Sequence, residues 1–83
     1  MDILFIYADG CDDCDRMKKY IEKAIAESGK KIEIKKFDSN TKAAIDIAIK
    51  HGIDDLPSCV IGNKIFQGKY FEYEKINEVV KSL

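Results

Sequence analysis

Within the first 28 residues, a continuous apolar run is followed by apolar residues at helical spacing, and this change of pattern limits the folds that the chain can adopt. Residues 3–7 are a continuous apolar run, mostly β-branched and aromatic, which is typical of a strand that is buried on both faces. After a short break, apolar residues recur with the spacing of one helical face, at Met17, Tyr20, Ile21, Ala24 and Ile25. The sequence therefore predicts a central strand followed by an amphipathic helix that ends at Ser28 and Gly29.

The middle of the chain predicts a second strand and a second helix. Residues 32–37 alternate between apolar and charged side chains, which indicates a half-exposed strand at the edge of a sheet. Residues 41–50 are rich in Ala and Ile and predict a helix that His51 and Gly52 end. Its N-cap candidates are Asp38, Ser39 and Asn40.

The last third of the chain predicts a hairpin and a helix. Residues 58–61 and 64–67 read as antiparallel strands joined by a Gly62-Asn63 turn. The final helix is marked by apolar residues at helical spacing: Ile76, Val79, Val80 and Leu83. The element order is therefore β-α-β-α-β-β-α, with the first two strands parallel through a right-handed crossover. We predict the α/β class, a mixed four-stranded sheet with helices on both faces.

Length and charge exclude several classes of protein. The 83 residues weigh 9.4 kDa, so we expect one domain, residues 1–83. A net charge of -1 gives no electrostatic attraction for nucleic acid or anionic lipid. The apolar run near the N-terminus is too short for a signal peptide and lacks a preceding positive charge. We therefore expect a cytoplasmic protein with no membrane or nucleic-acid partner.

Three cysteines carry the chemistry: Cys11, Cys14 and Cys59. An odd number argues against a purely structural disulfide framework. The Cys11-x-x-Cys14 spacing is shared by redox dithiols, zinc half-sites and iron–sulfur ligand sets. A zinc or iron–sulfur site needs further ligands, for which the candidates are Cys59 and His51.

The position of the pair favours redox chemistry. Cys11 falls where the buried strand gives way to the helix, and helix N-terminal amides stabilise a thiolate there. Cys14 precedes Met17 by three residues and Ile21 by seven, so it shares the buried stripe. One accessible thiol and one sheltered thiol are what thiol–disulfide exchange requires. We therefore expect Cys11 to be the nucleophile and Cys14 to resolve the mixed disulfide.

These residues together resemble the thioredoxin/glutaredoxin superfamily over essentially the whole chain. The resemblance rests on the strand, on Cys11-x-x-Cys14 opening the first helix, and on Leu56-Pro57 before a hairpin with Gly62. It implies a thioredoxin-like fold and an enzyme that reduces disulfides of proteins or small molecules. It also implies that Pro57 is a cis-proline packed against the cysteine sulfurs and that Leu56 pairs its backbone with substrate. Pro57 is the only proline, and a cis peptide bond is essentially a proline option.

The sequence departs from both branches of this superfamily. Glutaredoxins that hold glutathione usually have a basic residue before the first cysteine and a Gly-Gly pair with an Asp near the last helix, and both are missing here. Thioredoxins usually have a Trp before the first cysteine and a buried acid where this chain has Phe5. The electron donor is therefore open between a thioredoxin-reductase-type flavoenzyme and glutathione. We expect disulfide-bearing client proteins, no bound cofactor and a monomer.

Four carboxylates surround the first cysteine: Asp9, Asp12, Asp13 and Asp15. Acidic side chains suit the first turn of a helix. They also oppose a thiolate on Cys11, so we expect Asp12 and Asp13 to offset part of the stabilisation from the helix dipole. A less stabilised thiolate favours the disulfide form, which would make the protein a reductant.

Alternatives stay open both for Cys59 and for the function of the whole chain. Cys59 lies two residues after Pro57 and so on the same strand face, where we expect it to act mainly as a small buried hydrophobe. The alternative for Cys59 is a regulatory or metal-ligating role. For the whole chain, the alternatives to an enzyme are an iron–sulfur or zinc protein, and a binding module without activity.

Overall fold

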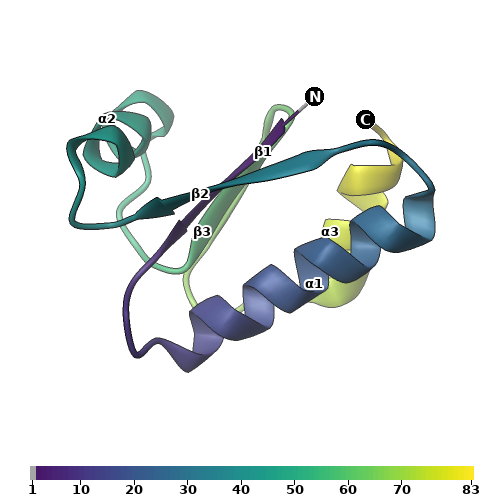
Figure 1. Cartoon of the computed structure of the whole chain (residues 1–83), viewed down its shortest axis with the longest axis horizontal. Coiled ribbons are helices and arrows are strands. Elements are labelled where there is room, and N and C mark those ends of the chain that lie inside the picture. Colours follow the sequence, from purple (N-terminus) through teal and green to yellow (C-terminus); the bar gives the residue numbers. More distant parts are fainter. Residues whose placement is uncertain (1) are drawn as a thin grey trace.

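The computed structural model describes residues 2–83 and contains four strands and three helices in the predicted order (Figure 1). The sheet has the strand order β2-β1-β3-β4. β1 runs parallel to β2 and antiparallel to β3, and β3 and β4 form the predicted hairpin. The strands are β1 (Asp2–Tyr7), β2 (Glu33–Asp38), β3 (Ser58–Ile61) and β4 (Lys64–Gln67), and the helices are α1 (Asp12–Ser28), α2 (Lys42–His51) and α3 (Tyr73–Lys81). The predicted α/β class and mixed sheet are confirmed.

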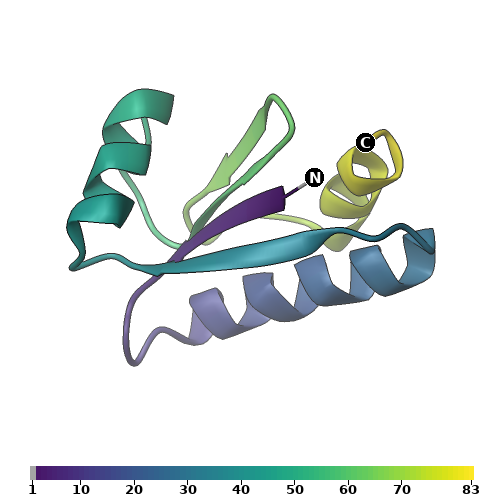
Figure 2. The same cartoon turned by 45° about the horizontal axis from the view of Figure 1, so that its top comes forward.

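Helices lie on both sides of this sheet, as predicted. α1 and α3 lie side by side against one face, and α2 stands on the other side (Figures 1 and 2). Alternation along the strands sends Ile3 and Phe5 toward α1 and α3. The core between sheet and helices is completed by Met17, Ile21, Ala24, Cys59, Ile61, Ile76 and Val80. No helix among residues 2–83 is long and apolar enough to span a membrane.

The N-cap of α2 differs from the predicted one, whereas the helix ends at the predicted residues. Thr41, and not Asp38, Ser39 or Asn40, is the N-cap, because the Thr41 hydroxyl accepts a hydrogen bond from the Ala44 N–H at 3.2 Å. Asp38 instead accepts from the Asn40 N–H at 2.9 Å and so forms the turn before the helix. At the other end, Gly52 takes a φ of +68°, which few other residues adopt without strain.

The coverage of the two sheet faces is unequal. α1 buries four side chains, whereas Ala44 is the only α2 side chain that is fully buried. Ile45 and Ile49 of α2 are 51% and 75% exposed. α2 therefore covers its side of the sheet less completely than α1 and α3 cover theirs.

Candidate redox site

Cys11 and Cys14 form a disulfide at the N-terminus of α1, with their Cα atoms 5.2 Å apart. β1 ends at Tyr7, and three residues, 8–10, connect the buried strand to Cys11, which immediately precedes α1. Gly10 has a φ of +69° in this connection, a conformation that glycine adopts readily. The first cysteine therefore lies between the end of the central strand and the start of the helix.

The sulfur of Cys11 caps α1. The Cys11 backbone is extended, with φ −102° and ψ 106°, and its Sγ accepts a hydrogen bond from the Cys14 N–H at 3.0 Å. An N-cap group normally satisfies one of the free N–H groups of the first turn in this way. After reduction, the same N–H and the helix dipole would stabilise negative charge on this sulfur.

The two sulfurs differ in their access to solvent. Cys14 is 2% exposed and belongs to the core with Met17 and Ile21, whereas Cys11 is partly exposed and only borders that core. The helical phase causes this difference, because Cys14 lies on the buried stripe and Cys11 lies before it. An incoming disulfide can therefore approach Cys11 more easily than Cys14.

The Leu56–Pro57 peptide bond is cis, as expected from the resemblance. Pro57 is buried and immediately precedes β3. Because Ser58 pairs with Ile6 near the end of β1, the proline reaches the sheet end from which the chain continues to Cys11. The Pro57 carbonyl accepts a hydrogen bond from the Gly68 N–H at 2.9 Å, which ties this segment to the end of β4.

The loop before Pro57 is held by side chains that the sequence analysis did not single out. Gln67 Oε1 accepts hydrogen bonds from the N–H groups of Asp54 and Asp55, at 2.9 and 3.2 Å. The Leu56 N–H donates to Asp55 Oδ1 at 2.8 Å. Three successive backbone donors are thus satisfied, and the loop keeps its shape without a ligand. The Asp55 contact could have been expected from the sequence, because Asp often accepts backbone hydrogen bonds in turns. Nothing in the sequence indicated the contacts of Gln67.

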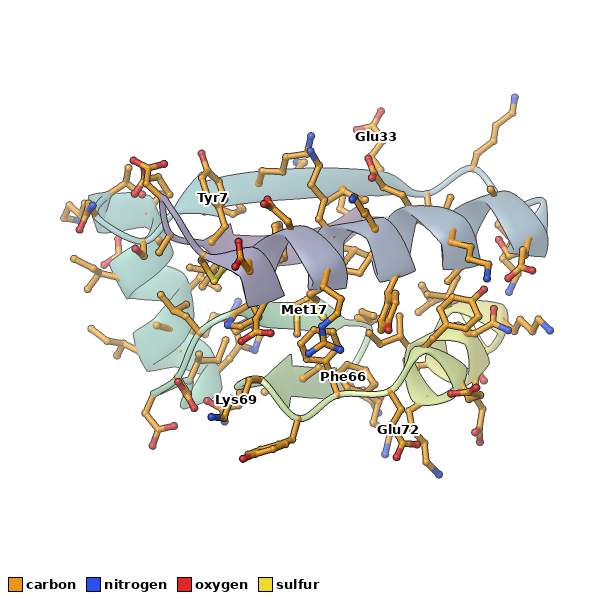
Figure 3. All side chains as sticks on the ribbon, turned by 90° about the horizontal axis from the view of Figure 1, so that it is seen from below. Tyr7, Met17, Glu33, Phe66, Lys69 and Glu72 are labelled. Carbon is orange, nitrogen blue, oxygen red and sulfur yellow. A yellow bond between two sulfur atoms is a disulfide. The ribbon has the colours of Figure 1, made fainter. Side chains whose placement is uncertain are left out.

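Arg16 joins the first turns of α1 to the segment after β4. Its guanidinium donates to the Lys69 carbonyl at 2.9 Å and lies 4.1 Å from the centre of the Phe71 ring. It also forms an ion pair with Asp13 at 3.3 Å. Figure 3 shows Lys69 and Tyr7 on opposite sides of the N-terminal half of α1. Arg16 and Lys69 are 53 residues apart, so the sequence pattern offered no sign of this contact.

The Asp13–Arg16 pair makes the two predicted tuning residues unequal. Arg16 offsets part of the Asp13 charge. Asp12 is exposed and has no ion-pair partner among residues 2–83. Of these two carboxylates, Asp12 is therefore the one without a paired cation.

A cavity of about 270 Å³ opens beside the buried cysteine. Phe5 and Cys14 form part of its wall, and Lys36 lies directly opposite Phe5 in the β1–β2 pairing. The other lining residues are Tyr7, Ala8, Asp15 and Lys18. Sequence analysis did not place Lys36 near the cysteines, because Lys36 belongs to a strand some twenty residues further along the chain.

Cys59 is a free, fully buried thiol in β3, opposite Phe5. Burial raises the pKa of the Cys59 thiol to about 12, although a hydrogen bond from the Phe66 backbone lowers it slightly. Among residues 2–83, no three His, Cys, Asp or Glu side chains gather into a group that could hold a metal ion. His51, the other proposed ligand, ends α2.

Burial of Cys59 predicts resistance to alkylation. In the oxidised protein, burial raises the pKa of the Cys59 thiol to about 12, so this thiol is almost entirely protonated and unreactive at pH 9. Iodoacetamide should therefore add no group to the native oxidised protein within an hour, and one group after unfolding in urea. Mass spectrometry distinguishes the two, and rapid labelling of the native form would contradict the burial of this thiol.

Comparison with known proteins agrees with this geometry. A family model described as a thioredoxin domain matches residues 1–81, and a search of curated proteins gives no match. A solved thioredoxin-like protein from Clostridium perfringens is 26% identical, with a TM-score of 0.76 over 99% of this chain and 69% of that chain. Thioredoxin 1 from Thermosipho africanus is 17% identical, with a TM-score of 0.71 over 99% and 92%. Oxidised thioredoxin O2 from Arabidopsis thaliana is 13% identical, with a TM-score of 0.67 over 99% and 73%.

Proposed function

The chain belongs to the thioredoxin domain family, and from this premise we propose that it is a thiol–disulfide oxidoreductase that reduces disulfides of client proteins or small molecules. One observation carries the proposal. The Cys11 sulfur is capped by a helix N–H and partly exposed, and its disulfide partner Cys14 is buried one turn later. This asymmetry suits a nucleophile and a resolving thiol.

The reaction consumes the reduced dithiol and regenerates the disulfide. The Cys11 thiolate attacks one sulfur of the client disulfide, forming a mixed disulfide and releasing the other client sulfur as a thiolate that takes up a proton. Cys14 then loses its proton, and its sulfur attacks Cys11. The Cys11–Cys14 disulfide forms, and the second client thiolate leaves and is protonated. Two electrons thus pass from the protein to the client.

Leu56 and Pro57 form the substrate surface in this proposal. The buried Pro57 ring and the hydrogen bond from the Gly68 N–H to the Pro57 carbonyl hold the chain before β3, and Leu56 is partly exposed at the same sheet end. Its backbone lies outside the β1–β3 pairing, which begins at Ser58. We propose that the Leu56 backbone pairs with an extended client segment once Asp55 Oδ1 releases the Leu56 N–H.

Each cycle needs an external dithiol or thiol donor, because the oxidised protein must be reduced again. We propose that either a thioredoxin-reductase-type flavoenzyme or glutathione supplies these electrons, and that the protein acts as a monomer in the cytoplasm. The cysteines themselves carry the electrons, so the proposed reaction requires no bound cofactor.

Turnover of a protein disulfide tests this function. Dithiothreitol, the flavoenzyme system and glutathione are each supplied separately as the electron donor. Insulin reduction should proceed with dithiothreitol and with one of the other two, and the faster of those two identifies the partner class. Cys14→Ser should stop turnover and accumulate a mixed disulfide on Cys11. Failure of all donors to support turnover, including dithiothreitol, would favour a binding module without activity.

We expect the Asp12 carboxylate to affect the acidity of the Cys11 thiol. Asp12→Asn should lower the pKa of the Cys11 thiol, because it removes an unpaired negative charge next to the developing thiolate. Asp13→Asn should lower it less, because Arg16 already offsets that charge. Thiolate absorbance at 240 nm against pH measures both, and a larger effect of Asp13→Asn would contradict this assignment.

A further inference from the structure

We propose that the groove between α2 and the loop of residues 53–56 is a docking site for the client, and that it selects an aliphatic side chain next to a lysine or arginine. This inference rests on the proposed function and names the substrate class of the same site. The occupant is a client segment that flanks the disulfide to be reduced.

The groove has a volume of about 430 Å³ and is open to solvent on one side. It results from the loose contact of α2 with the sheet, which leaves Ile45 51% exposed. Most of its wall is apolar and comes from β1, α2 and the loop: Ile6, Ala44, Ile45, Ala48, Ile53 and Leu56. Such a wall suits an aliphatic side chain, because burial of apolar surface is favourable.

The rim of the groove is negatively charged. Asp54 and Asp55 line it and are exposed, and neither forms an ion pair within residues 2–83. A client with a basic residue beside its apolar anchor would meet complementary charge, whereas an acidic client would be repelled.

Asp55 also links charge recognition to the backbone of Leu56. Its Oδ1 accepts the Leu56 N–H at 2.8 Å, so a client strand must displace this carboxylate before it can bond to that N–H. On the other side, a Cβ at Gly68 would come within 2.9 Å of Asp55 Oδ2, which shows that the carboxylate fills the space beside the loop. A client cation could draw the carboxylate away and free the Leu56 donor.

The groove lies at the sheet end from which β1 leads to the redox site, because it is lined by Ile6 near the end of β1 and by Leu56 before β3, and this position favours a client over an unrelated ligand. Leu56 lines the groove and precedes the cis-proline. A segment in the groove therefore reaches the sheet end at which Cys11 begins α1. Neither an apolar wall alone nor an acidic rim alone would specify this occupant, but the two together, at the sheet end that leads to Cys11, do.

Matched peptides test the inference. Each peptide has one intramolecular disulfide and differs only in the residues beside its cysteine: Leu-Lys, Leu-Glu or Ser-Lys. At low ionic strength, kcat/KM for Leu-Lys should exceed that for Leu-Glu by about tenfold, and 0.5 M salt should reduce this ratio. Leu-Lys should exceed Ser-Lys by about fivefold.

Two pairs of variants assign these preferences to the groove. The double variant D54N/D55N keeps the amide oxygen that can accept the Leu56 N–H, and should reduce the Lys-over-Glu ratio to about twofold. The control E33Q/E74Q makes the same change in net charge at exposed positions elsewhere and should leave the ratio unchanged. Ala48→Leu fills the groove and should remove the Leu-over-Ser preference, whereas Ala43→Leu, at an exposed position of the same helix, should retain it.

The outcomes separate this inference from the function on which it rests. Equal turnover of all three peptides would overturn the docking site and leave the oxidoreductase intact. No turnover of any peptide or of insulin would overturn both. Concentration-dependent dimerisation in sedimentation experiments that Ala48→Leu abolishes and Ala43→Leu preserves would mean that a second copy covers the groove, and would also overturn the inference.

Discussion

Replacement of Cys11 by serine should lower kcat/KM for disulfide reduction at least about a thousandfold, because an alcohol is barely ionised at neutral pH and cannot form the mixed disulfide. The capping contact from the Cys14 N–H is compatible with a serine oxygen, since serine is a favourable N-cap residue. The loss should therefore occur without unfolding, and circular dichroism should show a native spectrum.

Cys59 provides the matched control for this result. Cys59→Ala removes a thiol that is buried, so the folded variant should retain reductase activity within about twofold. A Cys11→Ser variant that kept more than a tenth of the wild-type activity would show that another group attacks the substrate. Equal losses in both variants would point to a structural effect of removing any cysteine.

Phe5→Ala should be the most destabilising of the simple core truncations. Phe5 is 1% exposed in the centre of β1 and contacts the core that contains Cys14 and Cys59. Truncation of a buried phenylalanine costs about 3–5 kcal/mol. A chain of this length has a total stability of about 4–12 kcal/mol, so the variant should be close to the unfolding threshold.

Urea denaturation of the oxidised proteins measures this difference. Ile65→Ala serves as the control, because Ile65 is 39% exposed in β4 and its truncation should cost less than about 1 kcal/mol. Similar losses for Phe5→Ala and Ile65→Ala would contradict the position of the core between the sheet and the α1–α3 layer.

The fold was predictable from the sequence because its local signals agree with one another. The apolar run of β1 and the single helical stripe of α1 fixed the first β-α unit, and Gly29 marked its end in the predicted position. The hairpin boundaries were also predicted without error. The cap of α2 was not, because Thr41 competed with three other good capping residues, and only the three-dimensional turn at Asp38 decides between them.

Only those parts of the site whose residues are close together in the sequence could be predicted. The spacing of Cys11 and Cys14 gave the pairing, and the helical phase gave their different burial. The supporting contacts come from distant segments: Arg16 reaches Lys69, and Gln67 reaches Asp54. Such contacts depend on how the elements pack. The α2 groove was missed for the same reason, since an Ala- and Ile-rich helix predicts tighter packing than the structure has.

The direct test of the central claim compares the two cysteines as nucleophiles in the reduced protein. Cys14→Ser leaves Cys11 available, and Cys11→Ser leaves Cys14 available, while the buried Cys59 is present in both. Each variant is mixed with an oxidised peptide, and the growth of the mixed disulfide is followed by mass spectrometry. The capped and accessible Cys11 should form it at least about a hundredfold faster than Cys14. Equal rates, or faster reaction at Cys14, would contradict the assignment of Cys11 as the attacking sulfur.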